Sequence, residues 1–170
     1  MHTADMLTTT IRFLRRIEFE AAHNIPLQGP VLMVVSHSSP ADLFFCLALL
    51  RHVGRSDGRY VVSADMVDSG RFRRFTESAL RDAHPRLGPL ATLAARLGSR
   101  LVPGMMRGVD TIPILREGDD SGSREQVLQS LDGGRLVTIA PEWGNDAHRD
   151  ANGLRPLTHG VASIARQFFE

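Results

Sequence analysis

The chain has 170 residues, a formal net charge of +1 and 42% hydrophobic residues. This length is enough for one domain that buries roughly 70% of the surface of its unfolded chain. The near-zero charge argues against nucleic acid as a partner, and a single cysteine, Cys46, excludes an internal disulfide. The longest apolar run, 43–50, is far shorter than the roughly 18 residues that indicate a membrane-spanning helix. We expect one cytoplasmic domain over residues 1–170.

The amino-terminal segment has the pattern of an amphipathic helix. Apolar residues recur at helical spacing over 7–21, and the opposite side carries Arg12, Arg15 and Arg16. The pattern predicts a helix within residues 1–22. Its arginine face either is solvated while the helix packs on the domain, or meets anionic lipid head groups at the inner face of the membrane.

From residue 29 onward, apolar runs alternate with helical patterns. This alternation predicts an α/β fold with a mixed, largely parallel sheet flanked by helices. We expect strands over 31–35, 59–64, 111–115 and 136–140. We expect helices near 41–52, 70–80, 86–97, 122–131 and 157–168.

A histidine and an aspartate follow the first predicted strand at a spacing of five positions. His37 and Asp42 form the pattern His-x-x-x-x-Asp at its carboxyl end, where open α/β sheets place their chemistry. An imidazole held by a carboxylate can act as a general base. The alternative is structural: His37 as a turn residue and Asp42 as a stabilising charge at a helix start.

Two further blocks follow later strands. Arg116 ends the run Asp110-Thr111-Ile112-Pro113-Ile114-Leu115-Arg116, and Pro141-Glu142-Trp143-Gly144 follows the strand predicted over 136–140. In order and separation, the three blocks resemble the glycerolipid acyltransferase family, which includes 1-acylglycerol-3-phosphate acyltransferases. The resemblance extends over roughly residues 17 to 170.

The resemblance implies a glycerolipid acyltransferase-like fold and an acyl transfer reaction. A fatty acyl group would move from an acyl-CoA or acyl carrier protein thioester to a hydroxyl of a lysophospholipid or related acceptor. His37 would be the general base and Asp42 its partner. Arg116 would bind the acceptor's phosphate, while Glu142 and Gly144 would order the acceptor site. The thioester is a co-substrate, so the resemblance implies neither a metal nor a resident cofactor. It also implies peripheral contact with a membrane.

The chain departs from the family pattern in two blocks. Trp143 separates Glu142 from Gly144, and no arginine follows directly, so one phosphate-binding residue of the family is missing. The sequence also stops at Glu170, before the strand with a Val-Pro signature that follows in the family. These departures leave open a non-catalytic lipid-binding relative of the same fold.

A serine-dependent lipid hydrolase is a third interpretation. Ser38 and Ser39 lie beside His37, although the glycine-flanked serine motif of hydrolases is absent. Five apolar residues could line an acyl path or pack in the core: Leu43, Phe44, Phe45, Leu47 and Leu90.

Overall fold

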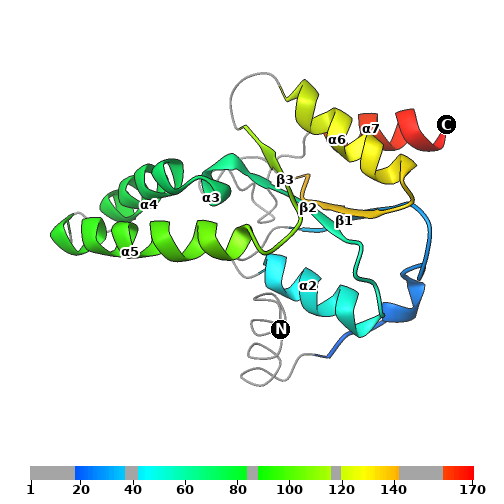
Figure 1. Ribbon diagram of the computed structural model, residues 1–170, viewed down its shortest axis with the longest axis horizontal. Helices are drawn as coiled ribbons and strands as arrows, with labels where there is room; N and C mark the ends of the chain where they lie inside the picture. The colour runs from blue at the N-terminus through cyan, green and yellow to red at the C-terminus, as the bar shows by residue number, and fades with distance from the viewer. Residues whose placement is uncertain (1–17, 37–41, 84–87, 116–119, 142–158) are drawn as a thin grey trace, which may run out of the picture.

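The computed structural model describes residues 18–36, 42–83, 88–115, 120–141 and 159–170. Within these ranges the chain forms an α/β layered structure around one sheet (Figure 1). All four strands of this sheet are parallel: β1 (Val31–Val34), β2 (Arg59–Ser63), β3 (Thr111–Ile114) and β4 (Leu136–Ile139). The predicted strands are confirmed, but the expected mixed character is not found in the described part of the chain.

The strand order is β1-β4-β2-β3, which places β1 and β3 at the two edges. The register pairs Val34 of β1 with Ile139 of β4, and Ser63 of β2 with Ile114 of β3. Because every strand runs in the same direction, all four carboxyl ends lie along one edge of the sheet. We call this the carboxyl edge.

Helices connect the strands, as parallel pairing requires. The described helical elements are η1 (Ala22–Asn24), α2 (Asp42–His52), α3 (Ala64–Val67), α4 (Ser69–Ala83), α5 (Gly88–Met106), α6 (Ser121–Asp132) and α7 (Gly160–Phe169). The helices predicted near 41–52, 70–80, 122–131 and 157–168 are confirmed to within a few residues. The four-residue helix α3 was not predicted.

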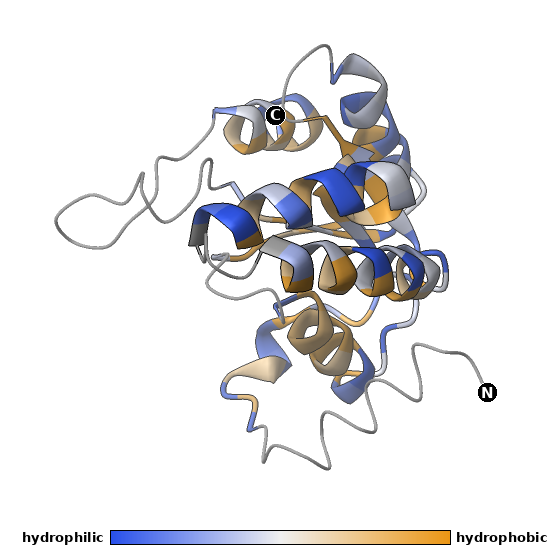
Figure 2. Cartoon of the chain, turned by 90° about the vertical axis from the view of Figure 1, so that its left-hand side faces the viewer, coloured by the Kyte–Doolittle hydropathy of each residue, from blue (hydrophilic) through white to orange (hydrophobic). Residues whose placement is uncertain are grey.

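Helix α2 covers one face of the sheet. Its buried residues Cys46, Leu47 and Leu50 pack with Tyr60 and Leu136 of the strands. The run from Leu43 to Leu50 is apolar without interruption because this helix is buried along most of its length. Hydrophobic and hydrophilic colours lie on different sides of the helices (Figure 2).

Helices α6 and α7 cover the opposite face. Val127 and Leu131 of α6 and Ile164 of α7 form a buried cluster with Ile112 and Val137. Residues 136 and 137 of β4 thus enter different clusters, as alternation along a strand requires. All four residues of β4 are buried, because helices cover the strand on both faces of the sheet. A strand buried on both faces has a continuous apolar pattern.

Helices α4 and α5 form an antiparallel hairpin that projects beyond the carboxyl edge (Figure 1). The helix expected near 86–97 is longer than predicted, because α5 continues to Met106 through Pro103. Pro103 is fully buried, so packing compensates for the hydrogen bond that proline cannot donate. At Gly98, an added Cβ would lie 2.9 Å from Cε1 of the buried Phe72, so glycine allows the two helices to approach closely.

The predicted amino-terminal helix lies mostly outside the described residues. Residues 18–21 are not α-helical. Ala21 has a φ of 52°, in the left-handed region, and precedes the 3-10 turn η1. The predicted boundary at residue 22 is therefore too late.

A buried arginine fixes the segment that leads into β1. The Arg55 guanidinium donates hydrogen bonds to the carbonyl oxygens of Pro26, at 2.8 Å, and Gly29, at 3.0 Å. Asp57 neutralises its charge, with 2.9 Å between Arg55 Nε and Asp57 Oδ1. These bonds to Arg55 lower the pKa of the Asp57 carboxyl below its usual value.

Candidate functional site

Of the residues predicted for the site, Asp42 is described, and it is the first residue of α2. His37, Arg116, Glu142 and Gly144 lie outside the described residues. For these four residues, the structure describes the strands and helices that precede and follow them in the chain.

The strands that precede His37 and Glu142 are direct neighbours. Strand β1 pairs with β4, and just beyond their last paired residues the Val35 amide donates to the Ile139 carbonyl oxygen at 3.0 Å. The chain leaves the described region at Ser36 after β1 and at Pro141 after β4. Both departures occur at the carboxyl edge, the place where parallel α/β sheets bind ligands.

The strand that precedes Arg116 is farther away. Strand β3 is the edge strand opposite β1, and three strand spacings of ~4.8 Å give a separation of about 14 Å. A hydrogen bond joins the end of β3 to the start of α6: the Leu115 amide donates to Asp120 Oδ1 at 2.9 Å. The strand before the histidine block is therefore next to the strand before the Pro-Glu block and three strand positions from the strand before the arginine block.

Asp42 is the first residue of α2 and lies one turn before the buried Cys46. Residues four positions apart share a helix face, and Cys46 and Leu50 are both buried there. The first turn of α2 is at the carboxyl edge (Figure 1). Desolvation, followed by the charge of Asp42, raises the pKa of the Cys46 thiol to about 11. A carboxylate near this edge is what a His-Asp pair would need.

The residues considered for an acyl path do not form one surface. Leu43, Phe44 and Leu47 of α2 pack in the core between this helix and the sheet. Leu90 is on α5, where its side chain is 62% exposed. Leu43, Phe44 and Leu47 therefore have the packing role that was the alternative interpretation, and Leu90 belongs to a different surface. Phe45 is half-buried and belongs to neither core cluster.

Polar groups that were not singled out in the sequence occupy the carboxyl end of β2. The Ser63 hydroxyl accepts a hydrogen bond from the Asp65 amide at 3.3 Å and donates to Asp65 Oδ2 at 3.1 Å. Strand β2 is adjacent to β4, so these groups lie on the same edge as Asp42. The signal was visible in the sequence: Ser63 is near the end of the strand predicted over 59–64, and Asp65 directly follows it.

Thr138 presents a buried hydroxyl without a hydrogen-bond partner in the described structure. It lies on the middle of β4, paired with Met33 and Tyr60, on the α2 side of the sheet. It is the one polar residue in the run Leu136-Val137-Thr138-Ile139-Ala140. An unsatisfied buried hydroxyl costs ~1–3 kcal/mol, so its presence requires a reason other than stability.

We predict that Thr138→Val increases the free energy of unfolding by about 1 kcal/mol, because it removes the unpaired hydroxyl. Urea denaturation measures the effect. The matched control is Thr92→Val, which removes a hydroxyl that donates to Glu77 Oε1 at 2.9 Å and should lower stability by ~0.5–1.5 kcal/mol. Equal losses in both variants would contradict the prediction.

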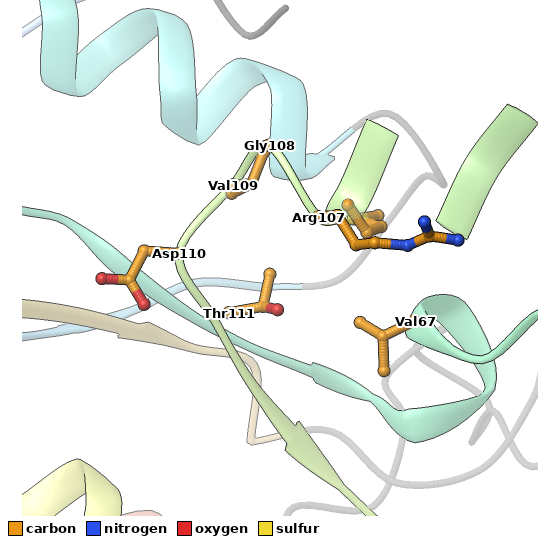
Figure 3. Close-up of a pocket in the computed structure, with 7 residues that line it drawn as sticks. Val67, Arg107, Gly108, Val109, Asp110 and Thr111 are labelled. Carbon is orange, nitrogen blue, oxygen red and sulfur yellow. The ribbon is translucent and has the colours of Figure 1, made fainter. Parts of the chain in front are cut away.

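A shallow depression of about 470 Å³ lies at the base of the α4–α5 hairpin (Figure 3). Its walls come from the end of α3, the end of α5 and the start of β3: Val67, Met106, Arg107, Gly108, Val109, Asp110 and Thr111. Asp42 is not among them. The Asp110 carboxylate is engaged by Arg59, at 2.8 Å, and Arg135, at 2.6 Å. We therefore assign the depression no role in the site.

Asp110 shows how this ion-pair network acts. Desolvation raises the pKa of its carboxyl, but hydrogen bonds from Arg135 and Arg59 outweigh that effect, and the net pKa is below its usual value. The network lies where the strands begin, at the end of the sheet opposite Asp42. Its role is structural.

No group of three or more histidine, cysteine, aspartate or glutamate side chains is placed to hold a metal ion in the ranges described. Among the helices described, none combines the length and the apolar character needed to cross a bilayer.

Comparisons of the chain with protein-family models, with curated proteins and with solved structures found no match. The class that the coordinates define is an α/β protein with a four-stranded parallel sheet and helices on both faces.

Proposed function

We propose that the chain is an O-acyltransferase of the glycerolipid type. It would move a fatty acyl group from an acyl-CoA or acyl carrier protein thioester to a hydroxyl of a lysophospholipid or related acceptor. The main support is the parallel sheet, in which β1 and β4 are neighbours and end at the same edge. The His-x-x-x-x-Asp block follows β1 in the sequence and the Pro-Glu block follows β4, so the strands that lead into the two blocks are neighbours.

The position of Asp42 supports the proposed role of the pair. Its carboxylate is at the start of α2, where it can accept a hydrogen bond from an imidazole next to the carboxyl edge. In the proposed reaction His37 takes the proton of the acceptor hydroxyl as its oxygen attacks the thioester carbonyl. Asp42 fixes the tautomer of the ring and stabilises the imidazolium.

The reaction balances without a covalent enzyme intermediate. A carbon–oxygen bond forms to the acceptor, the carbon–sulfur bond breaks, and the leaving thiolate takes the proton back from His37. Arg116 binds the acceptor's phosphate through a fork of two hydrogen bonds, and Glu142 and Gly144 order the acceptor site. Because β3 is the far edge strand, we propose that the phosphate lies away from the reacting hydroxyl.

The test is a colourimetric thiol-release assay on the purified chain with a long-chain acyl-CoA and lysophosphatidic acid. We expect thiol release that depends on the acceptor, with diacylated product identified by mass spectrometry. Repeating the assay with acyl carrier protein thioester identifies the donor.

The other two interpretations give different results in the same assay. A serine hydrolase would release free fatty acid without an acceptor and would be stopped by a fluorophosphonate. A non-catalytic lipid-binding relative would release no thiol with any acceptor. Either result would refute the proposed transfer. Cytoplasmic location with peripheral membrane contact belongs to the same proposal, because the acceptor is an amphiphile.

A further inference from the structure

The α4–α5 hairpin carries a row of exposed leucines. On α5, Leu90, Leu93, Leu97 and Leu101 are 62%, 53%, 54% and 66% exposed. At 3.6 residues per turn, their spacing places them within an arc of about 80° on one side of the helix. We call this row the leucine stripe. It accounts for four of the seven large hydrophobic residues that are exposed in the described part of the chain.

The opposite side of α5 explains why the stripe is left uncovered. Small or buried residues, Ala91, Ala95 and Ser99, face α4, and the hairpin packs through them. The buried face of α5 is thus already satisfied within the hairpin. Single exposed leucines are common, but a continuous row along one helix indicates a contact surface.

The charge around the stripe indicates what it contacts. Arg96 and Arg100 are exposed and border the stripe on its Leu93 side, and α5 contains no acidic residue. Helices α4 and α5 together contain six arginines and two acidic residues, a net charge of +4, whereas the whole chain carries +1. The positive charge of the protein is therefore concentrated on this hairpin.

We propose that the leucine stripe and its arginine border dock the protein on an anionic lipid surface. A helix that exposes leucines beside arginines fits the boundary between acyl chains and head groups, with the leucines below and the guanidinium groups among the phosphates. A second copy of the chain fits less well. A symmetric contact between two stripes would bring equally positive hairpins together.

The placement of the hairpin gives this docking a consequence for the site. The hairpin leaves the sheet through α3, directly after the carboxyl end of β2, and projects beyond the carboxyl edge (Figure 1). A membrane bound along α5 therefore lies next to a hairpin that is joined to the carboxyl edge, the edge at which Asp42 begins α2. This consequence depends on the proposed function, but the binding itself does not.

Sedimentation of the full chain with vesicles tests the proposal. One set of vesicles contains phosphatidylcholine alone, and the other contains phosphatidylcholine with phosphatidylglycerol. We expect binding to the anionic set that weakens with salt. Arg96→Gln with Arg100→Gln should lower the partition coefficient about fivefold per arginine. Leu93→Ser with Leu97→Ser should lower it on the order of tenfold or more.

Matched controls keep the result specific. Leu27→Ser replaces a leucine that is 67% exposed outside the hairpin, and Arg166→Gln replaces an arginine on α7 whose side chain is 81% exposed. Both should bind as the unmodified chain does, and so should His37→Ala. Circular dichroism verifies that each variant is folded.

Three outcomes would overturn the proposal. The first is absence of binding to anionic vesicles. The second is binding that the stripe and border variants leave unchanged, which would assign the contact to another segment. The third is a dimer in light scattering that the leucine variants dissociate. Acyl transfer measured on detergent-dispersed substrate would separate failure of docking from failure of the proposed reaction.

Discussion

Replacement of His37 by alanine is expected to lower the rate of acceptor-dependent thiol release by about 10² to 10⁴, the usual contribution of a general base. The reason is that no other group would remove the proton of the attacking hydroxyl. The loss should appear in kcat, because His37 is proposed to act on the reacting proton and Arg116 to bind the phosphate. Steady-state kinetics with varied lysophosphatidic acid measure both parameters.

His159→Ala is the matched control for this variant. His159 is exposed, precedes α7, and makes no side-chain capping hydrogen bond there. Its replacement should leave kcat and the unfolding transition unchanged. Full turnover in His37→Ala would refute the base assignment, and equal losses in both variants would point to a general effect on the fold.

Leu131→Ala is expected to have the largest effect on stability. Leu131 is fully buried between α6 and the sheet, where it packs with Ile112, Val127 and Val137. Leucine-to-alanine changes at such positions cost ~2–5 kcal/mol, through lost transfer free energy and the cavity left behind. Since domains of this size are stable by about 5–15 kcal/mol, the variant should lose a large share of its stability.

Leu97→Ala is the comparison for that prediction. The same side chain is removed, but from a position that is 54% exposed, so the unfolding free energy should change by no more than about 0.5 kcal/mol. Urea unfolding followed by far-ultraviolet circular dichroism gives both values. Similar losses at the two positions would contradict the assignment of Leu131 to the core and of Leu97 to the surface.

The fold class could be predicted from the sequence because each strand is an apolar run and each crossover helix has its own periodicity. The run Leu136-Val137-Thr138-Ile139-Ala140 is typical of a central parallel strand, and β4 is one. Helix α5 was predicted too short because glycine and proline after residue 97 are typical of helix ends. Burial of Pro103 in tertiary contacts overrides that local signal.

The candidate site was predictable only in part. Sequence order places blocks at strand ends, and parallel pairing confirms that those ends share an edge. Strand order is not encoded locally, so the separation of β3 from β1 could not be predicted from spacing. The leucine stripe was missed for a similar reason. Leu90 was considered only for the core or an acyl path, because exposure depends on which face of α5 meets α4.

Cys46 has a practical consequence for enzymology. Cys46 is the one cysteine of the chain, and its side chain is buried between α2 and the sheet. Its thiol stays protonated at neutral pH because its pKa is about 11. Disulfide reagents attack thiolates, so a native preparation should be almost silent toward them, and colour in a coenzyme A assay should come from product. On denaturation the same atom becomes reactive, which makes it a built-in reporter of global opening.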